Sequence, residues 1–194
     1  VGTFSMLAKL ARCDGRITPQ EVDAIERFMA EDLSLDPDSR RVARGIFNKA
    51  VESVETFQDY ASQFYNQFRS EPHLLAMMVD IMLRVSLSDG GLSAREESII
   101  LSAVKLFQLR DETYASLRAK YHGGDLGSFY AVLDANAADT DEEIKKKYRK
   151  LVSEYHPDKI AAKGLPDAFI QFANDKFREI QDAYDKIKEQ RGIK

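Results

Sequence analysis

The chain has 194 residues, of which 44% are apolar and 31% charged, and its formal net charge is −4 at pH 7. This composition is ordinary for a globular protein, and the length allows one large domain or two modest ones. Ten glycines, five prolines and no tryptophan favour long helices over a turn-rich sheet protein. The negative charge argues against a general nucleic-acid binder, because such proteins contact phosphates through an excess of lysine and arginine.

Cysteine content and hydropathy exclude two further kinds of structure. Cys13 is the only cysteine, so the chain can form neither an intrachain disulfide nor a thiolate cluster for a metal, which fits a reducing cytoplasm. The most apolar run, Leu74 to Leu87, is interrupted by Asp80 and Arg84. No stretch approaches the roughly 20 residues that cross a bilayer, so we predict no membrane span in this sequence.

A weak internal repeat organises the first hundred residues. Residues 7–29 align with residues 82–104, and each unit has the pattern of a helix, an Asp-Gly turn and a second helix. The two turns are Asp14-Gly15 and Asp89-Gly90. The repeat therefore predicts two similar helix pairs in this part of the chain.

Each Asp-Gly turn is followed by a capping box, in which a hydroxyl side chain and a glutamate three residues later satisfy free N–H groups of a helix. The two boxes are Thr18 with Glu21 and Ser93 with Glu96. Pro19 suits the first position of a helix, where its missing N–H costs nothing. We expect a helix to begin directly after each box.

Three more helices are expected in the N-terminal part, beginning at Asp36-Pro37, near Phe57 and at Asp111, and the first helix of the second pair is expected to begin at Glu71-Pro72. The second of them carries aromatic residues at helical spacing, which favours a buried core over a client-binding groove: Phe57, Tyr60, Phe64 and Phe68. The last is expected to have Asp111 as its cap and to run through Tyr121. The whole part is thus predicted to be a bundle of about seven helices without strands.

The glycine-rich stretch from Tyr121 to Ser128 marks the natural boundary between two domains. We expect an N-terminal domain over residues 1–122, a short linker over residues 123–128 and a C-terminal domain over residues 129–194.

The C-terminal domain contains a basic amphipathic helix. Thr140 and Glu143 form a third capping box and predict its start. Its apolar and aromatic residues lie on one face and its cations elsewhere: Ile144, Tyr148, Leu151, Val152 and Tyr155 against Lys145, Lys146, Arg149 and Lys150. Pro157 disfavours helical backbone in the residue before it, so the helix should end near Tyr155 and leave His156 and Asp158 in a loop.

A second amphipathic helix is predicted from about Pro166 to Lys188. Its apolar residues repeat at helical spacing: Ala173, Phe177, Ile180, Tyr184 and Ile187. This helix could pack antiparallel on the first, so we expect a hairpin that is closed by the loop around His156. No nucleophile or set of metal ligands is spaced around His156, which argues against catalysis there.

Four segments of the C-terminal domain together resemble a J domain in order and spacing. They are Phe129-Tyr130-Ala131-Val132-Leu133, Glu143 to Leu151, Tyr155-His156-Pro157-Asp158-Lys159, and Lys176 to Tyr184. The resemblance implies an all-α fold and a co-chaperone that stimulates ATP hydrolysis by a DnaK-type chaperone of the heat-shock 70 family. It implies no reaction of the chain's own and no cofactor.

The resemblance also implies which residues touch the chaperone: His156, Pro157, Asp158, Lys145, Tyr148, Arg149 and Lys150. In this interpretation Pro157 fixes the loop and Asp158 offers a carboxylate to an arginine of the partner. Residues 141–143 are acidic and stand four positions before Lys145, Lys146 and Lys147, so helix stability explains part of the basic run. Arg149 and Lys150, with Lys145 one turn earlier, are the expected docking charges, while Tyr148 suits a core role and a contact role equally.

Two features qualify the resemblance. Asp134 stands where J domains usually have glycine, and the segment from Lys163 to Pro166 is similar to the DjlA type, membrane-anchored DnaJ-like co-chaperones with a C-terminal J domain. The repeated helix, Asp-Gly and helix pattern resembles the TerB-like fold, which is the N-terminal cytoplasmic module of that type. We therefore expect the chain on the cytoplasmic side of a bacterial inner membrane, tethered by a segment that precedes Val1.

Other functions were weighed against this one. The acidic residues Asp14, Glu21, Asp89 and Glu96 would suit a metal- or stress-sensing TerB-like module with a vestigial J domain. The capping boxes account for both glutamates, and neither turn has the spacing of a calcium loop, so no metal site is predicted. Nucleic-acid binding through Lys146 and Lys150 is disfavoured by the acidic remainder of the chain. The N-terminal domain is expected to serve protein interaction or the choice of client or location, and self-association is left open.

Overall fold

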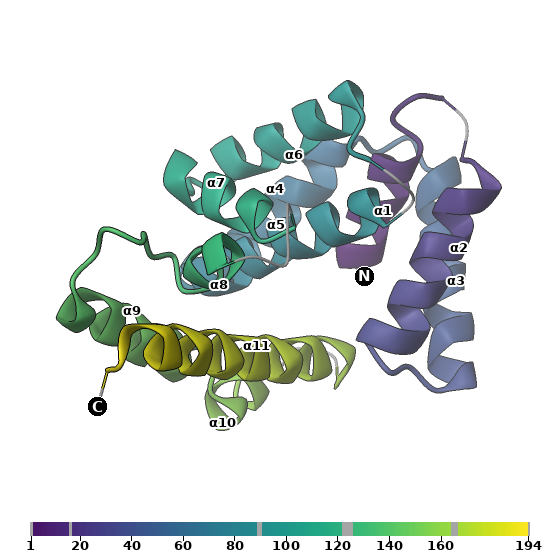
Figure 1. Cartoon of the computed structure of the whole chain (residues 1–194). Helices are drawn as coiled ribbons and strands as arrows, with labels where there is room; N and C mark the ends of the chain where they lie inside the picture. Colours follow the sequence, from purple (N-terminus) through teal and green to yellow (C-terminus); the bar gives the residue numbers. More distant parts are fainter. Residues whose placement is uncertain (1, 16, 89–90, 122–125, 164–166, 194) are drawn as a thin grey trace. The chain divides into compact units, whose positions relative to one another are not determined.

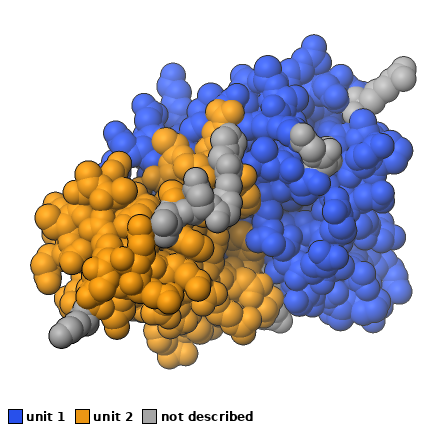
Figure 2. Space-filling view, in the orientation of Figure 1, with its two compact units in different colours: residues 1–114 blue, residues 115–194 orange. Residues whose placement is uncertain are grey.

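The computed structural model describes residues 2–15, 17–88, 91–121, 126–163 and 167–193. All regular secondary structure in these ranges is helical (Figure 1), which confirms the predicted fold class. The chain divides into two compact units, Val1–Tyr114 and Ala115–Lys194 (Figure 2), called unit 1 and unit 2 below.

Unit 1 contains the predicted helices and one short π-helix, η1, that continues α2. Their bounds are α1 Gly2–Ala11, α2 Pro19–Arg27, η1 Phe28–Asp32, α3 Pro37–Glu52, α4 Phe57–Phe68, α5 Pro72–Leu87, α6 Ala94–Leu106 and the start of α7 Asp111–Ala119. Asp111 is the first residue of α7 rather than its cap, and α7 ends before Tyr121. Both differences are shifts of one or two residues at a helix terminus, which is the usual uncertainty of assigned helix bounds.

Local capping chemistry sets the helix starts of unit 1. The capping boxes of Thr18 and Ser93 are both present, with Glu21 and Glu96 accepting the N–H groups of the cap residues at 2.6 and 2.9 Å. A further box, Thr56 with Asp59, begins α4. These polar contacts join residues three positions apart, which is why they can be seen in the sequence.

The core of unit 1 forms around α5. This helix is apolar on nearly all sides, its residues from Leu74 to Leu83 are mostly buried, and it contacts α1, α2, α4 and α6. Phe64 of α4 lies 4.7 Å from Phe68 and 5.9 Å from Phe107 between ring centroids. Phe57 is buried with them, so the expected core role of these phenylalanines is confirmed.

Unit 2 is built on an antiparallel hairpin. Its helices after α7 are α8 Leu126–Val132, α9 Asp141–Glu154, α10 Pro157–Ala161 and α11 Asp167–Arg191. Contacts between α9 and α11 run in opposite directions along the chain: Arg191 reaches Asp141, Tyr184 stacks on Tyr148, and Phe177 lies beside the His156 that follows α9. The predicted hairpin is therefore confirmed, and α8 packs on α11 beside it.

Asp134, which replaces the usual glycine, follows α8 with a φ of 51°. This left-handed backbone explains why glycine is favoured there, since most side chains crowd the backbone in that conformation and Asp is among the few that adopt it. The Asp134 carboxylate accepts a hydrogen bond from Ser116 Oγ at 3.0 Å. Lys120 Nζ lies 3.6 Å from Glu179 of α11, so residues 115–121 belong to the compact unit of the hairpin.

Candidate functional site

The turn between α9 and α11 holds the motif His156-Pro157-Asp158. As predicted, α9 ends before the motif. Tyr155 is the C-cap of α9, and its backbone N–H donates to Leu151 O at 2.9 Å. The prediction of a loop after Tyr155 was wrong, because Pro157 begins the short helix α10. Proline suits the first position of a helix as well as it ends the preceding one.

His156 is the N-cap of α10. Its backbone is extended, with φ −60° and ψ 130°, and its Nδ1 accepts the N–H of Asp158 at 3.3 Å. The ring stands edge-on to Phe177 of α11, with 6.0 Å between centroids. The histidine therefore shapes the turn, and its contact with α11 holds the turn against the hairpin.

The Asp158 carboxylate is directed into solvent. Its side chain is 92% exposed and that of His156 is 47% exposed, with 3.8 Å between His156 Nδ1 and Asp158 Oδ2. Pro157 and the cap restrict the backbone on which this carboxylate stands. The arrangement presents one carboxylate in a defined direction and almost free of internal packing.

The cations of α9 divide into two groups. Lys147 Nζ donates to Asp139 Oδ2 at 2.6 Å, and this bond lowers the pKa of Asp139. The sequence had instead predicted a pair between Lys147 and Glu143. Glu143 instead accepts the N–H of Thr140 at 2.8 Å, and this capping bond lowers its own pKa. The Lys147 ammonium is therefore engaged in an ion pair within unit 2.

The second group of α9 cations consists of Lys145, Arg149 and Lys150, of which the last two are exposed. Arg149 is exposed, and Lys145 is half-buried one turn before it. The Lys150 side chain is 69% exposed, and its Nζ lies 3.9 Å from the carboxylate of Glu154. Sequence reasoning searched only for acidic residues before each cation and so missed Glu154, which its position four residues after Lys150 could have revealed.

Tyr148 packs within the hairpin. Its ring stacks on that of Tyr184 with 4.0 Å between centroids and an interplanar angle of 9°. Burial and the nearby Asp185 raise the pKa of its hydroxyl, while a hydrogen bond to Gln181 acts in the opposite direction. The stacked face of the Tyr148 ring therefore packs against α11.

Arg191 holds the other end of the hairpin, a role that the sequence did not reveal. It donates to Tyr130 Oη at 2.7 Å, to Asp141 Oδ1 at 3.0 Å, and to the backbone oxygens of Ala137 and Asp139 at 2.6 and 2.8 Å. Its guanidinium also lies over the Tyr130 ring, 5.2 Å from the centroid. This cluster fixes the start of α9 against the end of α11.

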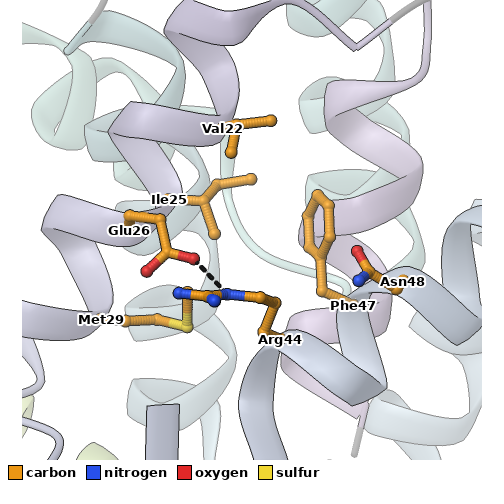
Figure 3. Close-up of a pocket in the computed structure, with 7 residues that line it drawn as sticks. All are labelled: Val22, Ile25, Glu26, Met29, Arg44, Phe47 and Asn48. Carbon is orange, nitrogen blue, oxygen red and sulfur yellow. Dashed lines mark hydrogen bonds and ion pairs between the residues drawn. The ribbon is translucent and has the colours of Figure 1, made fainter. Parts of the chain in front are cut away.

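Unit 1 has a pocket of about 510 Å³ between α2 with η1 and α3 (Figure 3). Its lining is mainly apolar, with one amide and one ion pair: Val22, Ile25, Glu26, Met29, Arg44, Phe47 and Asn48. The dashed line in Figure 3 marks the Arg44 to Glu26 contact of 2.6 Å that joins the two walls. These groups provide no nucleophile paired with a base.

The metal-binding alternative gains no support from the described residues, which contain no group of three potential ligands suitably placed. Glu21 and Glu96 serve their capping boxes, and Asp89 lies outside the described residues. Burial, with the carboxylates of Glu96, Asp14 and Glu21, raises the pKa of Cys13 to about 11. Its thiol is therefore protonated at neutral pH, unlike a metal-ligating or nucleophilic thiolate.

Comparison with known families matches both parts of the chain. Residues 1–119 match the tellurite resistance protein TerB, and residues 128–192 match the DnaJ domain. The co-chaperone protein DjlA of Shewanella oneidensis is 31% identical over 99% of this chain and 78% of its own length. This chain belongs to the DjlA family of co-chaperones.

Other DjlA proteins agree with this assignment. Those of Photobacterium profundum and Escherichia coli K12 are 27% and 28% identical, over 98% and 99% of this chain and 77% and 79% of their own lengths. No solved structure matches the chain. Both resemblances noted in the sequence are thereby confirmed: this DjlA-family chain is a non-enzymatic co-chaperone with a TerB and a DnaJ domain, and the latter implies a partner of the Hsp70 class.

Within the ranges that the structure describes, no helix of this DjlA-family chain combines the length and the apolar character needed to cross a bilayer.

Proposed function

We propose that this DjlA-family chain docks on a DnaK-type chaperone through its His156-Pro157-Asp158 turn and the basic face of α9, and thereby stimulates ATP hydrolysis by that chaperone. The exposed and directed carboxylate of Asp158 carries the proposal, because the fold makes little use of it. An arginine of the partner is its natural counterpart, since a guanidinium and a carboxylate form strong charge-assisted hydrogen bonds.

The docking surface is proposed to include the turn and one side of α9: His156, Pro157, Asp158, Lys145, Tyr148, Arg149 and Lys150. Arg149 and Lys150 are exposed and Lys145 is half-buried, and we propose that the three cations act largely by attracting an acidic surface before contact. Tyr148 is half-buried against Tyr184 and directly precedes Arg149 in the chain, and we include it as the aromatic contact of this surface. The turn supplies the short, directional contact, and α9 supplies the rate of encounter.

We keep the sequence-based domain boundaries of 1–122, 123–128 and 129–194 as a proposal, although residues 115–121 pack in the compact unit of the hairpin. The first domain is proposed to serve protein interaction or the choice of client or location. We place the chain's activity at the cytoplasmic face of the bacterial inner membrane, where a DnaK-type partner has access to the DnaJ domain.

The test is steady-state ATP hydrolysis by a DnaK-type chaperone with the full chain and with Asp158→Asn. We expect the variant to lose stimulation while its helicity and melting temperature stay close to those of the parent, because exposed side chains contribute little to the fold. Asp182→Asn, a matched change on an exposed residue of α11, should retain stimulation.

Arg149→Ala and Lys150→Ala should weaken association mainly through its rate, and added salt should mimic them in the parent. Full stimulation by Asp158→Asn at low salt, or a loss that only follows unfolding, would refute the docking surface. No stimulation by the parent chain at micromolar concentration would refute the function.

A further inference from the structure

Glu154, two residues before His156, stands where the end of the helix and its burial both disfavour a charged carboxylate. It is the last residue of α9, where the helix dipole is negative and where this helix has no basic residue. Its pair with Lys150 has the carboxylate C-terminal to the lysine, which is the weaker orientation. Burial raises its pKa, so the fold penalises its charged form. A residue that breaks local rules without a gain in stability is a candidate for a functional role.

The surroundings of Glu154 are cationic and lie beside the docking turn. Lys150 Nζ is 3.9 Å from the Glu154 carboxylate, and the Glu154 side chain is 33% exposed. Lys159 of α10 also attracts it, and Lys159 Nζ donates to Ser153 Oγ at 2.6 Å. The carboxylate therefore lies near two cations, one on each side of the His156-Pro157-Asp158 turn.

We infer that Glu154 attenuates docking: its carboxylate offsets the charge of Lys150 in the free protein and slows association with the acidic surface of the DnaK-type partner. This inference rests on the proposed function and concerns the regulation of the same surface. Lys150 remains exposed and available for contact, so Glu154 lowers the attraction at a distance and leaves the final contact of Asp158 intact. Glu154 thus acts on docking indirectly, through its effect on the charge of Lys150.

The expected size of the effect follows from screening. Removing one negative charge from a cationic surface should raise the association rate about two- to fivefold near 0.02 M salt, where the Debye length is roughly 20 Å. At about 0.5 M salt that length falls to roughly 4 Å, so the gain should almost vanish. The dissociation rate should change little, since the directional contact is made elsewhere.

The experiment measures association of the full chain with a DnaK-type chaperone by stopped-flow fluorescence, at several salt concentrations, with ATP hydrolysis measured in parallel. The variants are Glu154→Gln, Lys150→Ala and the two combined, with Asp182→Asn as the control of equal charge change. We expect Glu154→Gln to associate faster at low salt with a steeper salt dependence, and most of this gain to be absent when Lys150 is alanine. Its melting temperature should equal or exceed that of the parent.

Each other outcome overturns the inference in a distinct way. Slower association or lost stimulation in Glu154→Gln would make the carboxylate a direct contact with the partner. A gain equal to that of Asp182→Asn, or one that persists without Lys150, would reduce the effect to net charge. If the parent chain fails to bind the chaperone, both the proposed function and the role of Glu154 are refuted. If the parent stimulates ATP hydrolysis but the association rate of Glu154→Gln equals that of the parent, only the role of Glu154 is refuted.

Discussion

Truncation of Tyr148 tests which part of the proposed surface is scaffold and which part is contact. The Tyr148 ring stacks on Tyr184, a buried residue of α11, and links the middle of α9 to the middle of α11. Tyr148→Ala removes the stack and the apolar burial together. Tyr148→Phe keeps both and removes only the hydroxyl, whose bond to Gln181 would be lost.

The magnitude follows from the geometry of the stack. An aromatic pair contributes about 0.5–1.5 kcal/mol beyond its buried area, and truncation of a fully buried aromatic residue costs about 3–5 kcal/mol. Tyr148 is half-buried, so we expect Tyr148→Ala to cost about 2–4 kcal/mol. In a unit of this size that lowers the melting temperature by about 10–25 °C. Tyr148→Phe should cost about 1 kcal/mol or less.

The assay combines thermal melting by circular dichroism with hydrogen exchange of peptides from α9 and α11, which separates unit 2 from unit 1. We expect Tyr148→Ala to lose protection in both helices and to stimulate the chaperone's ATPase only at low temperature, where the hairpin is still folded. Tyr148→Phe should keep protection and stimulation. Unchanged melting of Tyr148→Ala, or lost stimulation in a fully protected Tyr148→Phe, would refute the packing argument.

Two further predictions concern backbone strain and pH. Asp134→Asn should leave the free energy of unfolding unchanged, and Asp134→Gly should change it little, because relief of backbone strain offsets the lost bond to Ser116. Asp134→Ala should lower the free energy of unfolding by about 1–2 kcal/mol, as measured in urea. Equal stability of the Ala and Gly variants would contradict the strain. The capping bond lowers the pKa of Glu143 in the folded chain, so its stabilisation is complete above the ordinary carboxyl pKa and is lost as pH falls. The parent should therefore melt above Glu143→Gln at pH 7. The gap should narrow as the pH falls below the ordinary carboxyl pKa and close once the pH is below the lowered pKa of the folded chain, while a constant gap would contradict the linkage.

Helix starts were the most predictable part of this protein. The boxes at Thr18, Ser93 and Thr140 each join residues three positions apart, so their geometry depends on the local chain alone. The periodic apolar residues of α9 and α11 predicted the hairpin for the same reason. The short helix α10 was missed because five residues carry too little periodicity, and Pro157 was read only as the end of α9.

The candidate site was predicted in its residues but only partly in its geometry. The sequence identified His156, Pro157 and Asp158 through their order. It did not reveal that His156 caps α10 or that its ring lies against Phe177, because Phe177 is 21 positions away in the chain.

The sequence by itself determined the helices, their caps, the polarity of their faces and the motif between α9 and α11, since each depends on neighbours within about one helical turn. Only the tertiary structure decided which charges remain available for docking. Lys147 turns to Asp139, Arg191 reaches Tyr130 across 61 positions, and Glu154 is partly buried beside two lysines. The attraction between charges depends on their distance in space and on the solvent around them, and neither quantity is set until the hairpin closes.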